Sequence, residues 1–361
     1  MITLKEIHER DKRPPSVTVY MTCYNHEKYL DEAIRGVLMQ KTNFPVNIVI
    51  HDDASTDRSA EIIRRYASEN PNITAIIEET NYYQNGKSFF PKVLPYLMGK
   101  YIAYCECDDF WIDENKLQIQ VDYLEANPDC IAVYSNTLPV NKYSQYDEAS
   151  RATWNPKTGE GDYPSNILTG LIHQLASLVI RNFWRLMTSE DIDFYIKLRG
   201  VGDQRILAIL LRLGKVHYFA QEFAAYRHVI DSKDSWSSKL AKMGEYERLQ
   251  ESTLWMSEVY RMLDHFFGKV HYYKYFFVLL RELKGHIKFH GSVIKDAKLN
   301  ECYNLSNIPL YIWPAFAGYA TYRVARKIIK AILPERVLTM IRKMKYNCSL
   351  FSVLCSLFSV L

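Results

Sequence analysis

Three carboxylates occupy four consecutive positions in the stretch YCECDDFW, residues 104–111. Glu106, Asp108 and Asp109 come directly after an apolar run and directly before two aromatic residues. Like charges this close repel one another, so the crowding lowers stability unless a cation lies among them. Oxygen ligands without a His/Cys spacing favour Mg²⁺ or Mn²⁺ over zinc. The stretch therefore predicts a divalent metal site with oxygen ligands.

Short apolar runs alternate with helical periodicity in the first part of the chain. Apolar residues at Leu30, Ile34 and Val37 have the spacing of a buried helix face. The runs typical of strands are VTVYMT (17–22), VNIVIH (46–51), ITAIIE (73–78), YIAYCE (101–106) and IAVYS (131–135). This alternation predicts an α/β fold with a doubly wound, mainly parallel sheet.

Polar clusters follow three of these runs. Thr22, Tyr24 and Asn25 end the first run, Asp52 and Asp53 end the second, and the acidic stretch ends the fourth. Ligands of open parallel sheets bind beyond the carboxyl ends of the strands. We therefore expect the three clusters to line one crevice.

The motifs of several nucleotide-binding and hydrolytic families are absent. The turn after the first run reads TCYNHEKY and lacks the GxGxxG of dinucleotide-binding folds. The chain also has no GxxxxGK[ST] phosphate loop and no GxSxG nucleophile elbow. A nucleoside diphosphate can instead be held by a divalent metal that carboxylates bind.

Four blocks of sequence, in order, resemble the successive blocks of family 2 glycosyltransferases with the GT-A fold. They are VTVYMTCYNHEKYLDEAIRGVLMQ (17–40), IVIHDDASTDRS (48–59), YCECDDFW (104–111) and VGDQRILAILLRLGKVHYFAQEFAAYRHVIDSKDSWS (201–237). Together they span roughly two thirds of the chain. The QxxRW element of processive polysaccharide synthases is missing, so we expect one sugar to be transferred per encounter.

The resemblance implies a set of site residues. Thr22 and Tyr24 would line the nucleobase pocket, and Asp52 would accept a hydrogen bond from the base. Asp108 and His228 would ligate Mn²⁺ or Mg²⁺, and Asp203 would be the catalytic base. The full nucleotide-binding set is Thr22, Tyr24, Asn25, Asp52, Asp53, Glu106, Asp109 and Arg227.

The matched blocks differ from the family pattern in residue type at two positions. Glu106, which would approach the ribose, stands where the family has the first aspartate of DxD, and Ala54 stands where it often has glycine. Asp109 is the extra acid that many members carry, and Arg227 lies in a YR block that closes over the diphosphate in similar enzymes.

Structural explanations compete with these roles. Asp203 could be a favourable charge at a helix start, in which case the substitutes as base are Glu190, Asp191 and Asp193. His228 could satisfy a structural hydrogen bond. Acids at strand ends are often helix caps, which is an alternative for Asp53, Ser55 and Asp57. Packing at the crevice wall is the expectation for Phe110 and Trp111, and burial for Cys105 and Cys107.

The expected activity is inverting transfer of a sugar, in the first instance from a UDP-sugar, to a glycan or lipid-linked acceptor in cell-surface polysaccharide synthesis. The base would deprotonate the acceptor hydroxyl while the metal stabilises the departing diphosphate. Two alternatives stay open. One is a membrane-associated sugar-nucleotide binding or scaffold protein without turnover, and the other is a sugar-phosphate nucleotidylyltransferase, whose glycine- and arginine-rich phosphate loop is not found here.

Composition and charge set the predicted organisation. The chain has 361 residues, of which 48 % are hydrophobic, and a net charge of +4, which does not predict a nucleic-acid partner. Seven cysteines without a CxxC pair, and an N-terminus without an apolar stretch, predict a cytoplasmic protein. We expect a catalytic domain at 1–235, a helical extension at 236–310, and basic amphipathic helices at 311–361 that contact an anionic membrane surface at the inner face of the cell membrane.

Overall fold

The computed structural model describes residues 3–153, 160–163, 174–198, 202–228 and 242–268. The chain divides into two units, Met1–Cys302 and Tyr303–Leu361, and every described residue belongs to the first. The predicted basic helices at 311–361 therefore lie outside the described residues, as does most of the predicted extension at 236–310. No helix within the described ranges is both long enough and apolar enough to span a bilayer.

One mixed sheet of nine strands organises the described residues. Its order is β3-β2-β1-β4-β8-β6-β9-β5, and β7 pairs with β9. The strands are β1 (Val17–Cys23), β2 (Val46–Asp52), β3 (Ile73–Ile77), β4 (Tyr101–Tyr104), β5 (Phe110–Trp111), β6 (Cys130–Val140), β7 (Gly161–Tyr163), β8 (Val179–Arg181) and β9 (Lys215–Arg227). β1 to β4 pair only in parallel with one another, which confirms the predicted doubly wound α/β fold for this half.

The other half of the sheet departs from the predicted pattern. β8 runs antiparallel between β4 and β6, and β6 pairs in parallel with β9 over most of its length. Residues 136–165 are polar and rich in turn residues, which predicts a loop or linker. This prediction is wrong in part, because β6 continues to Val140 and is followed by α6 (Glu148–Thr153) and β7. Asn136 is buried in β6, where its amide donates to Ala220 O at 2.6 Å and accepts from the Tyr218 hydroxyl at 2.7 Å. Partners on β9 thus stabilise polar residues that look like a loop in the sequence.

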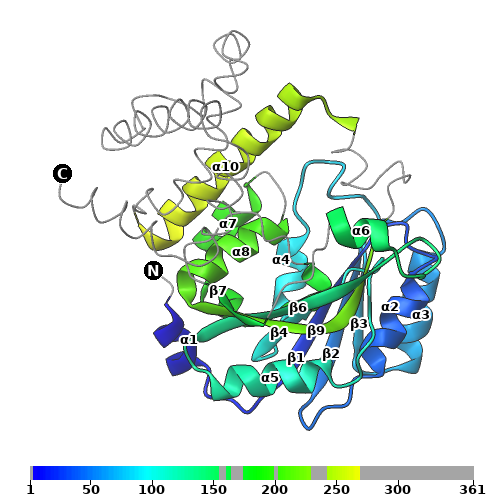
Figure 1. Ribbon diagram of the computed structural model, residues 1–361, viewed down its shortest axis with the longest axis horizontal. Helices are drawn as coiled ribbons and strands as arrows, with labels where there is room; N and C mark the ends of the chain where they lie inside the picture. Colours follow the sequence, from blue (N-terminus) through cyan, green and yellow to red (C-terminus); the bar gives the residue numbers. More distant parts are fainter. Residues whose placement is uncertain (1–2, 154–159, 164–173, 199–201, 229–241, 269–361) are drawn as a thin grey trace, which may run out of the picture. The chain divides into compact units, whose positions relative to one another are not determined.

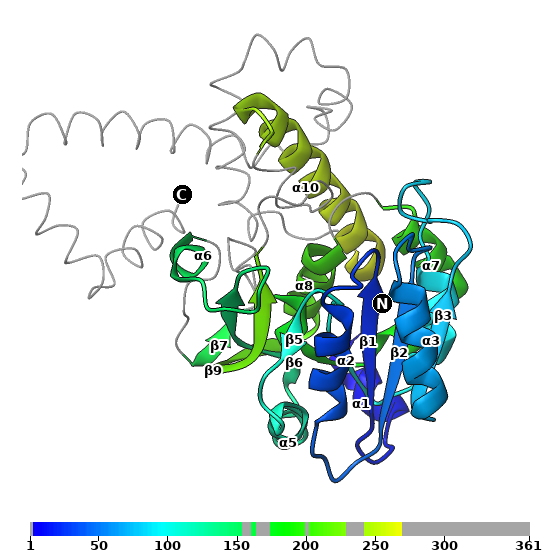
Figure 2. The ribbon, with the colours of Figure 1, turned by 90° about the vertical axis from the view of Figure 1, so that its right-hand side faces the viewer.

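Helices cover both faces of the sheet (Figures 1 and 2). Val17, Val19 and Met21 of β1 enter a core cluster with α2, α3 and α5, whereas Tyr20 enters a second cluster with α8 and α10. This alternation is the two-residue period of a strand buried on both faces. The helices are α1 (Leu4–Arg10), α2 (Leu30–Leu38), α3 (Ser59–Glu69), α4 (Phe90–Val93), α5 (Lys116–Ala126), α6 (Glu148–Thr153), α7 (Ser189–Ile196), α8 (Gly202–Leu213) and α10 (Glu245–Phe267).

Two helices matter most for the site. Residues 202–213 have the apolar spacing of an amphipathic helix and form α8, which starts with Gly202 and Asp203. Helix α2 approaches β5 closely at Gly36, where an added Cβ would lie 2.8 Å from the backbone N and O of Trp111. Only glycine allows this approach, so the position of α2 relative to the acidic stretch is fixed by backbone contact.

Candidate active site

The loops after β1 and β2 are tied to each other. Asn25 has a positive φ of 57°, and its side-chain oxygen accepts from Thr56 N at 2.7 Å. Its own N–H donates to Ser55 Oγ at 2.9 Å. The Tyr24 hydroxyl accepts from Gln84 Nε2 at 2.9 Å, while Thr22 is half-buried and its carbonyl accepts from Cys107 N at 3.0 Å. The first predicted cluster therefore lies against the second cluster and the acidic stretch.

The two aspartates at the end of β2 hold loops in place. Asp52 is fully buried and accepts from the N–H of Ser55 at 3.0 Å and from its hydroxyl. Asp53 accepts from Tyr82 N at 2.7 Å and Tyr83 N at 3.0 Å, so it orders a distant loop and does not cap α3. Asp57 is the member of the predicted set of caps (Asp53, Ser55 and Asp57) that contacts the start of α3. Its carboxylate accepts a hydrogen bond from Ser59 N at 2.9 Å.

Ala54 has a left-handed backbone conformation. Its φ is 58°, a region that glycine adopts without the steric cost that alanine has. The glycine that similar enzymes often have at this position is therefore explained by the backbone of the turn, and alanine keeps that backbone.

The acidic stretch places its three carboxylates at the carboxyl end of β4. Burial, then the charge of Asp108, then that of Asp203, raise the pKa of Glu106 from 4.5 to about 8. Burial and the charges of Asp108 and Glu106 also raise the pKa of Asp109 well above its usual value. The Asp108 side chain is 42 % exposed, and its carboxylate lies 4.0 Å from Nε2 of His26. Negative charge is thus concentrated here with few cations nearby.

Asp203 belongs to the same group of charges. It is half-buried in the first turn of α8, and its charge contributes to the raised pKa values of Glu106 and of buried Tyr134. The structure therefore brings the predicted base next to the acidic stretch. Asp191, one of the substitutes, caps α7 together with Thr188 and pairs with His265 at 3.0 Å.

The end of β9 is hydrogen-bonded to the acidic stretch. Arg227 N donates to Asp109 Oδ1 at 2.8 Å, and Arg227 Nε donates to the Asp108 carbonyl at 2.8 Å. The guanidinium already donates to four protein acceptors, which favours a supporting role over the predicted direct contact with a diphosphate. His228 is buried, which lowers its pKa, and Nδ1 lies 2.7 Å from Ser150 Oγ. A neutral imidazole of this kind is a competent metal ligand.

The donor set fits a hard cation only if a ligand supplies further oxygens. Within the described ranges, no three His, Cys, Asp or Glu side chains converge as a complete metal site. Asp109 Oδ2 is nevertheless buried without a hydrogen-bond partner in the described part of the chain, beside the exposed Asp108 carboxylate. A Mg²⁺ or Mn²⁺ ion that shares phosphate oxygens with Asp108 matches this arrangement.

The aromatic and sulfur-containing neighbours of the acids are structural, as expected. Trp111 is buried and donates from Nε1 to the Ala176 carbonyl at 2.7 Å. Cys105 and Cys107 are fully buried. Phe110 is half-buried, with the Arg227 guanidinium 5.4 Å from its ring centre.

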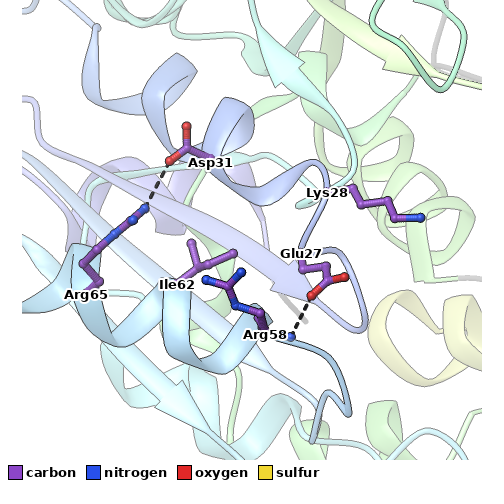
Figure 3. A pocket seen from close by; sticks show the side chains of 6 residues that line it. All are labelled: Glu27, Lys28, Asp31, Arg58, Ile62 and Arg65. Carbon is purple, nitrogen blue, oxygen red and sulfur yellow. Dashed lines mark hydrogen bonds and ion pairs between the residues drawn. The ribbon is translucent and has the colours of Figure 1, made fainter.

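An open hollow of about 390 Å³ lies between the starts of α2 and α3 (Figure 3). It is lined by Glu27, Lys28, Asp31, Arg58, Ile62 and Arg65. Its acids have protein partners, since Asp31 pairs with Arg65 at 3.2 Å and Glu27 accepts from Arg58 N at 3.1 Å. None of the predicted site residues lines it, so the hollow is distinct from the candidate site.

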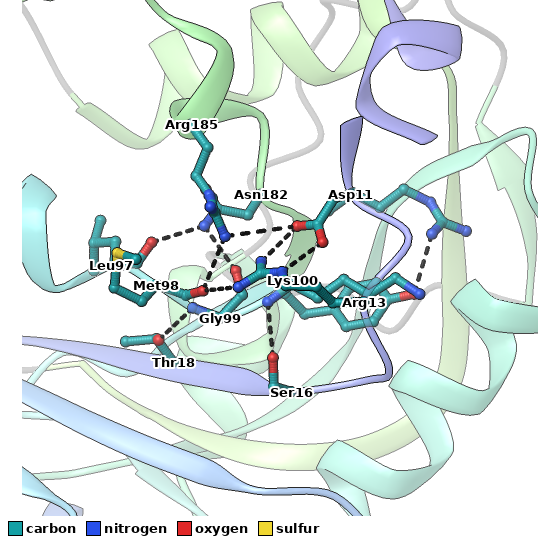
Figure 4. Close-up of polar contacts among 12 residues, drawn as sticks. Asp11, Arg13, Ser16, Thr18, Leu97, Met98, Gly99, Lys100, Asn182 and Arg185 are labelled. Atoms are coloured by element: carbon teal, nitrogen blue, oxygen red, sulfur yellow. Dashed lines mark hydrogen bonds and ion pairs between the residues drawn. The ribbon is translucent and has the colours of Figure 1, made fainter. Parts of the chain in front are cut away.

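Polar residues at the opposite ends of β1 and β4 form a different kind of cluster (Figure 4). Gly99 N donates to Thr18 Oγ1 at 2.9 Å, and Asn182 Nδ2 donates to the carbonyls of Leu97 and Gly99 at 2.8 Å each. Arg13 bonds both carboxylate oxygens of Asp11 and the Met98 carbonyl. We call these contacts the amino-end network; its residues are Asp11, Arg13, Ser16, Thr18, Leu97, Met98, Gly99, Lys100, Asn182 and Arg185.

Comparison with known proteins agrees with this geometry. Residues 18–182 match the family model described as glycosyl transferase family 2. An uncharacterized protein of Mycobacterium tuberculosis is 40% identical over 114 residues, which cover 31% of this chain and 32% of that protein. An uncharacterized glycosyltransferase of Methanocaldococcus jannaschii is 25% identical over 284 residues, or 76% of this chain and 89% of its own.

A solved structure shares the fold. The crystal structure of S. aureus TarS 1–349 in complex with UDP-GlcNAc has a TM-score of 0.53 and 16% sequence identity, covering 80% of this chain and 79% of that one. The chain matches about a third of the length of the mycobacterial relative. The matched family model, together with the parallel strands and the acids at their carboxyl ends, leads to one conclusion: over residues 18–182, the chain is similar to glycosyl transferase family 2.

Proposed function

We propose that this protein is a metal-dependent, inverting glycosyltransferase that takes its sugar from a nucleotide-sugar. The observation that carries the proposal is the Glu106 carboxyl beside Asp108 at the carboxyl end of β4, with Asp203 near enough to act on it: burial, then the charge of Asp108, then that of Asp203, raise the pKa of Glu106 to about 8. Such mutual repulsion at the carboxyl ends of parallel strands is typical of a site that a cation or substrate completes.

The chain's own residues divide the chemistry between them. Asp108, with His228 as a second candidate ligand, would hold a divalent cation, which would supply charge stabilisation to a departing diphosphate. Asp203, at the start of α8, accepts the proton of the acceptor hydroxyl as that oxygen attacks the anomeric carbon. A single displacement from the side opposite the leaving group inverts the configuration.

The nucleotide side of the site is held by the loops after β1 and β2. Thr22 and Tyr24 face the nucleobase in this proposal, and Glu106 approaches the ribose. Asp52 keeps the loop after β2 in place through the N–H of Ser55, and Asp53 ties that loop to the one after β3 through the N–H groups of Tyr82 and Tyr83. The protein of similar fold was solved with UDP-GlcNAc, which makes UDP-sugars the first donors to test.

The experiment that tests this proposal compares Asp203→Asn with the wild type. We expect UDP binding to be retained, while release of UDP from the donor falls by about 10²–10⁴-fold, the usual contribution of a general base. Asp193→Asn, an exposed acid on α7, is the matched control and keeps full activity. Loss of activity in the Asp193 variant alone would reassign the base. Wild-type protein that binds UDP-sugars and never turns them over would favour the scaffold alternative.

We further propose that the acceptor is a glycan or lipid-linked molecule reached at an anionic membrane surface. The sequence between 323 and 345 carries eight Lys/Arg residues and one acid, in the pattern of amphipathic helices. The test is sedimentation of the full chain with vesicles that contain phosphatidylglycerol, against neutral vesicles and against a chain that lacks 321–361. Equal sedimentation of the two chains would contradict membrane contact by this segment.

A further inference from the structure

We infer that Glu32, on α2, is a positioning residue that keeps the Asp108 carboxylate available to a metal by neutralising Arg227. The inference rests on the proposed function, because it concerns the same metal-diphosphate site. Glu32 is not one of the predicted site residues, and it lies 195 positions from Arg227 in the sequence.

Arg227 is a buried cation next to the acidic stretch. Its side chain is 1 % exposed, and the guanidinium carbon lies 4.3 Å from the ring centre of Tyr29 and 5.4 Å from that of Phe110. It contacts Asp108 through the backbone carbonyl and not through the carboxylate. The carboxylate of Asp108 therefore stays open to solvent beside a buried positive charge.

Glu32 supplies the carboxylate that Arg227 pairs with instead. Arg227 Nη2 lies 2.7 Å from Glu32 Oε2, and the same oxygen accepts from Ser144 Oγ at 2.7 Å. Arg227 Nη1 completes the arrangement with Ser144 Oγ at 3.0 Å and the Asn141 carbonyl at 3.1 Å. Glu32 thus joins α2, the segment after β6 and the end of β9 at one point.

Removing the charge of Glu32 leaves Arg227 buried without a carboxylate partner. A buried charge without its partner is strongly unfavourable, so the guanidinium then pairs with the nearest remaining acids. Those acids are Asp108, whose backbone carbonyl already accepts from Arg227 Nε, and Asp109, whose carboxylate accepts from the backbone N–H of Arg227. Arg227 would then compete with a metal for the same oxygens.

The structure offers a matched control on the same helix. Asp31 precedes Glu32, is exposed to a similar degree (41 % against 40 %), and pairs with Arg35 at 2.8 Å and Arg65 at 3.2 Å. Neither arginine contacts the acidic stretch in any bond found in the described ranges. Asp31→Asn therefore removes a carboxylate of the same helix from its two exposed arginine partners without freeing a cation next to Asp108.

The experiment titrates UDP into wild type, Glu32→Gln and Asp31→Asn by calorimetry, with and without Mn²⁺. We expect Glu32→Gln to weaken binding about tenfold in Mn²⁺ and to leave metal-free binding unchanged, as for the loss of a partner that orients a metal ligand. Asp31→Asn should match the wild type in both conditions. Equal behaviour of the two variants, or equal weakening with and without Mn²⁺, would overturn the inference.

Hydrogen exchange of the ligand-free proteins separates this inference from the proposed function. Glu32→Gln should speed the exchange of the amides at 105–111 and 141–146, and Asp31→Asn should not. Faster exchange without weaker Mn²⁺-dependent binding would reduce Glu32 to a structural residue and overturn the inference. Failure of the wild type to bind UDP with any metal would instead contradict the proposed donor site.

Discussion

The two ends of β1 and β4 carry polar side chains in opposite electrostatic situations. At one end, the amino-end network pairs the backbone of Leu97, Gly99 and Lys100 with side chains of Ser16, Thr18 and Asn182. At the other end, burial and neighbouring acids raise the pKa values of the Glu106 and Asp109 carboxyls. Among the described residues each end has one buried oxygen without a partner, Asn182 Oδ1 and Asp109 Oδ2, so the ends differ in the repulsion between carboxylates.

The difference separates scaffold from site. Hydrogen bonds to buried polar groups stabilise a scaffold, because an unpaired group costs about 1–3 kcal/mol. Carboxylates that a ligand completes repel one another in the free protein, at a cost in stability. The same strands therefore gain stability at their amino ends and hold unfavourable electrostatics at their carboxyl ends.

Asn182→Ala should have the largest effect on stability within this comparison. The substitution removes the amide that donates to two buried carbonyls, so we expect the free energy of unfolding to fall by about 2–3 kcal/mol. Urea unfolding measures this change. UDP affinity per folded molecule should stay the same, because the network lies at the other end of the strands.

The control for this prediction is Asn85→Ala. Asn85 is exposed and donates to the Asn81 carbonyl at 2.7 Å, so its loss should change stability by no more than about 0.5 kcal/mol. An Asn182 variant as stable as the Asn85 variant, or one with weakened UDP binding, would break the proposed division between the two ends.

The pH dependence of stability should have opposite signs at the two ends. We expect these changes in the free energy of unfolding to be smaller than that of Asn182→Ala. Burial would raise the pKa of Asp11, but hydrogen bonds from Arg13 and its charge lower it below 3.8. Asp11 therefore contributes stability above its unfolded pKa, and that contribution is lost as pH falls through the folded pKa. Glu106 has its folded pKa raised from 4.5 to about 8, so wild-type stability falls as pH rises between these values.

Urea unfolding across pH, on Glu106→Gln and Asp11→Asn, measures the two signs. Glu106→Gln should gain stability over the wild type from about pH 4.5 to about pH 8, since glutamine has no charge to bury. Asp11→Asn should be less stable than the wild type at neutral pH and approach it in acid. Parallel pH profiles for the two variants would show that the two ends do not differ electrostatically.

Most of the fold could be predicted from local pattern. The runs at 17–22 and 46–51 are mainly apolar, as expected for strands buried on both faces, and they are β1 and β2. Gly202–Leu213 is amphipathic at helical spacing and is α8. The extension of β6 to Val140 could not be predicted, because Asn136 and Thr137 are polar and their buried environment depends on β9, far away in the sequence.

The same distinction holds for the candidate site. Asp108, Asp109 and Glu106 are adjacent in the sequence, so their repulsion could be predicted from spacing alone. Asp203 could be placed beside them only through the family resemblance. The Glu32–Arg227 pair joins residues 195 positions apart, and its one local signal is an acid on the first turn of the helix that follows β1. Pairs of this kind depend on topology, which residue spacing does not encode.

The most direct test of the account is calorimetric titration of UDP into wild-type protein and Asp108→Ala, each with and without Mn²⁺. The account predicts wild-type binding that is strengthened by Mn²⁺, and loss of that strengthening in Asp108→Ala while its metal-free binding persists. UDP binding that ignores both Mn²⁺ and Asp108, or no UDP binding under any metal, would contradict the claim that the acids at the carboxyl end of β4 hold a metal-diphosphate site.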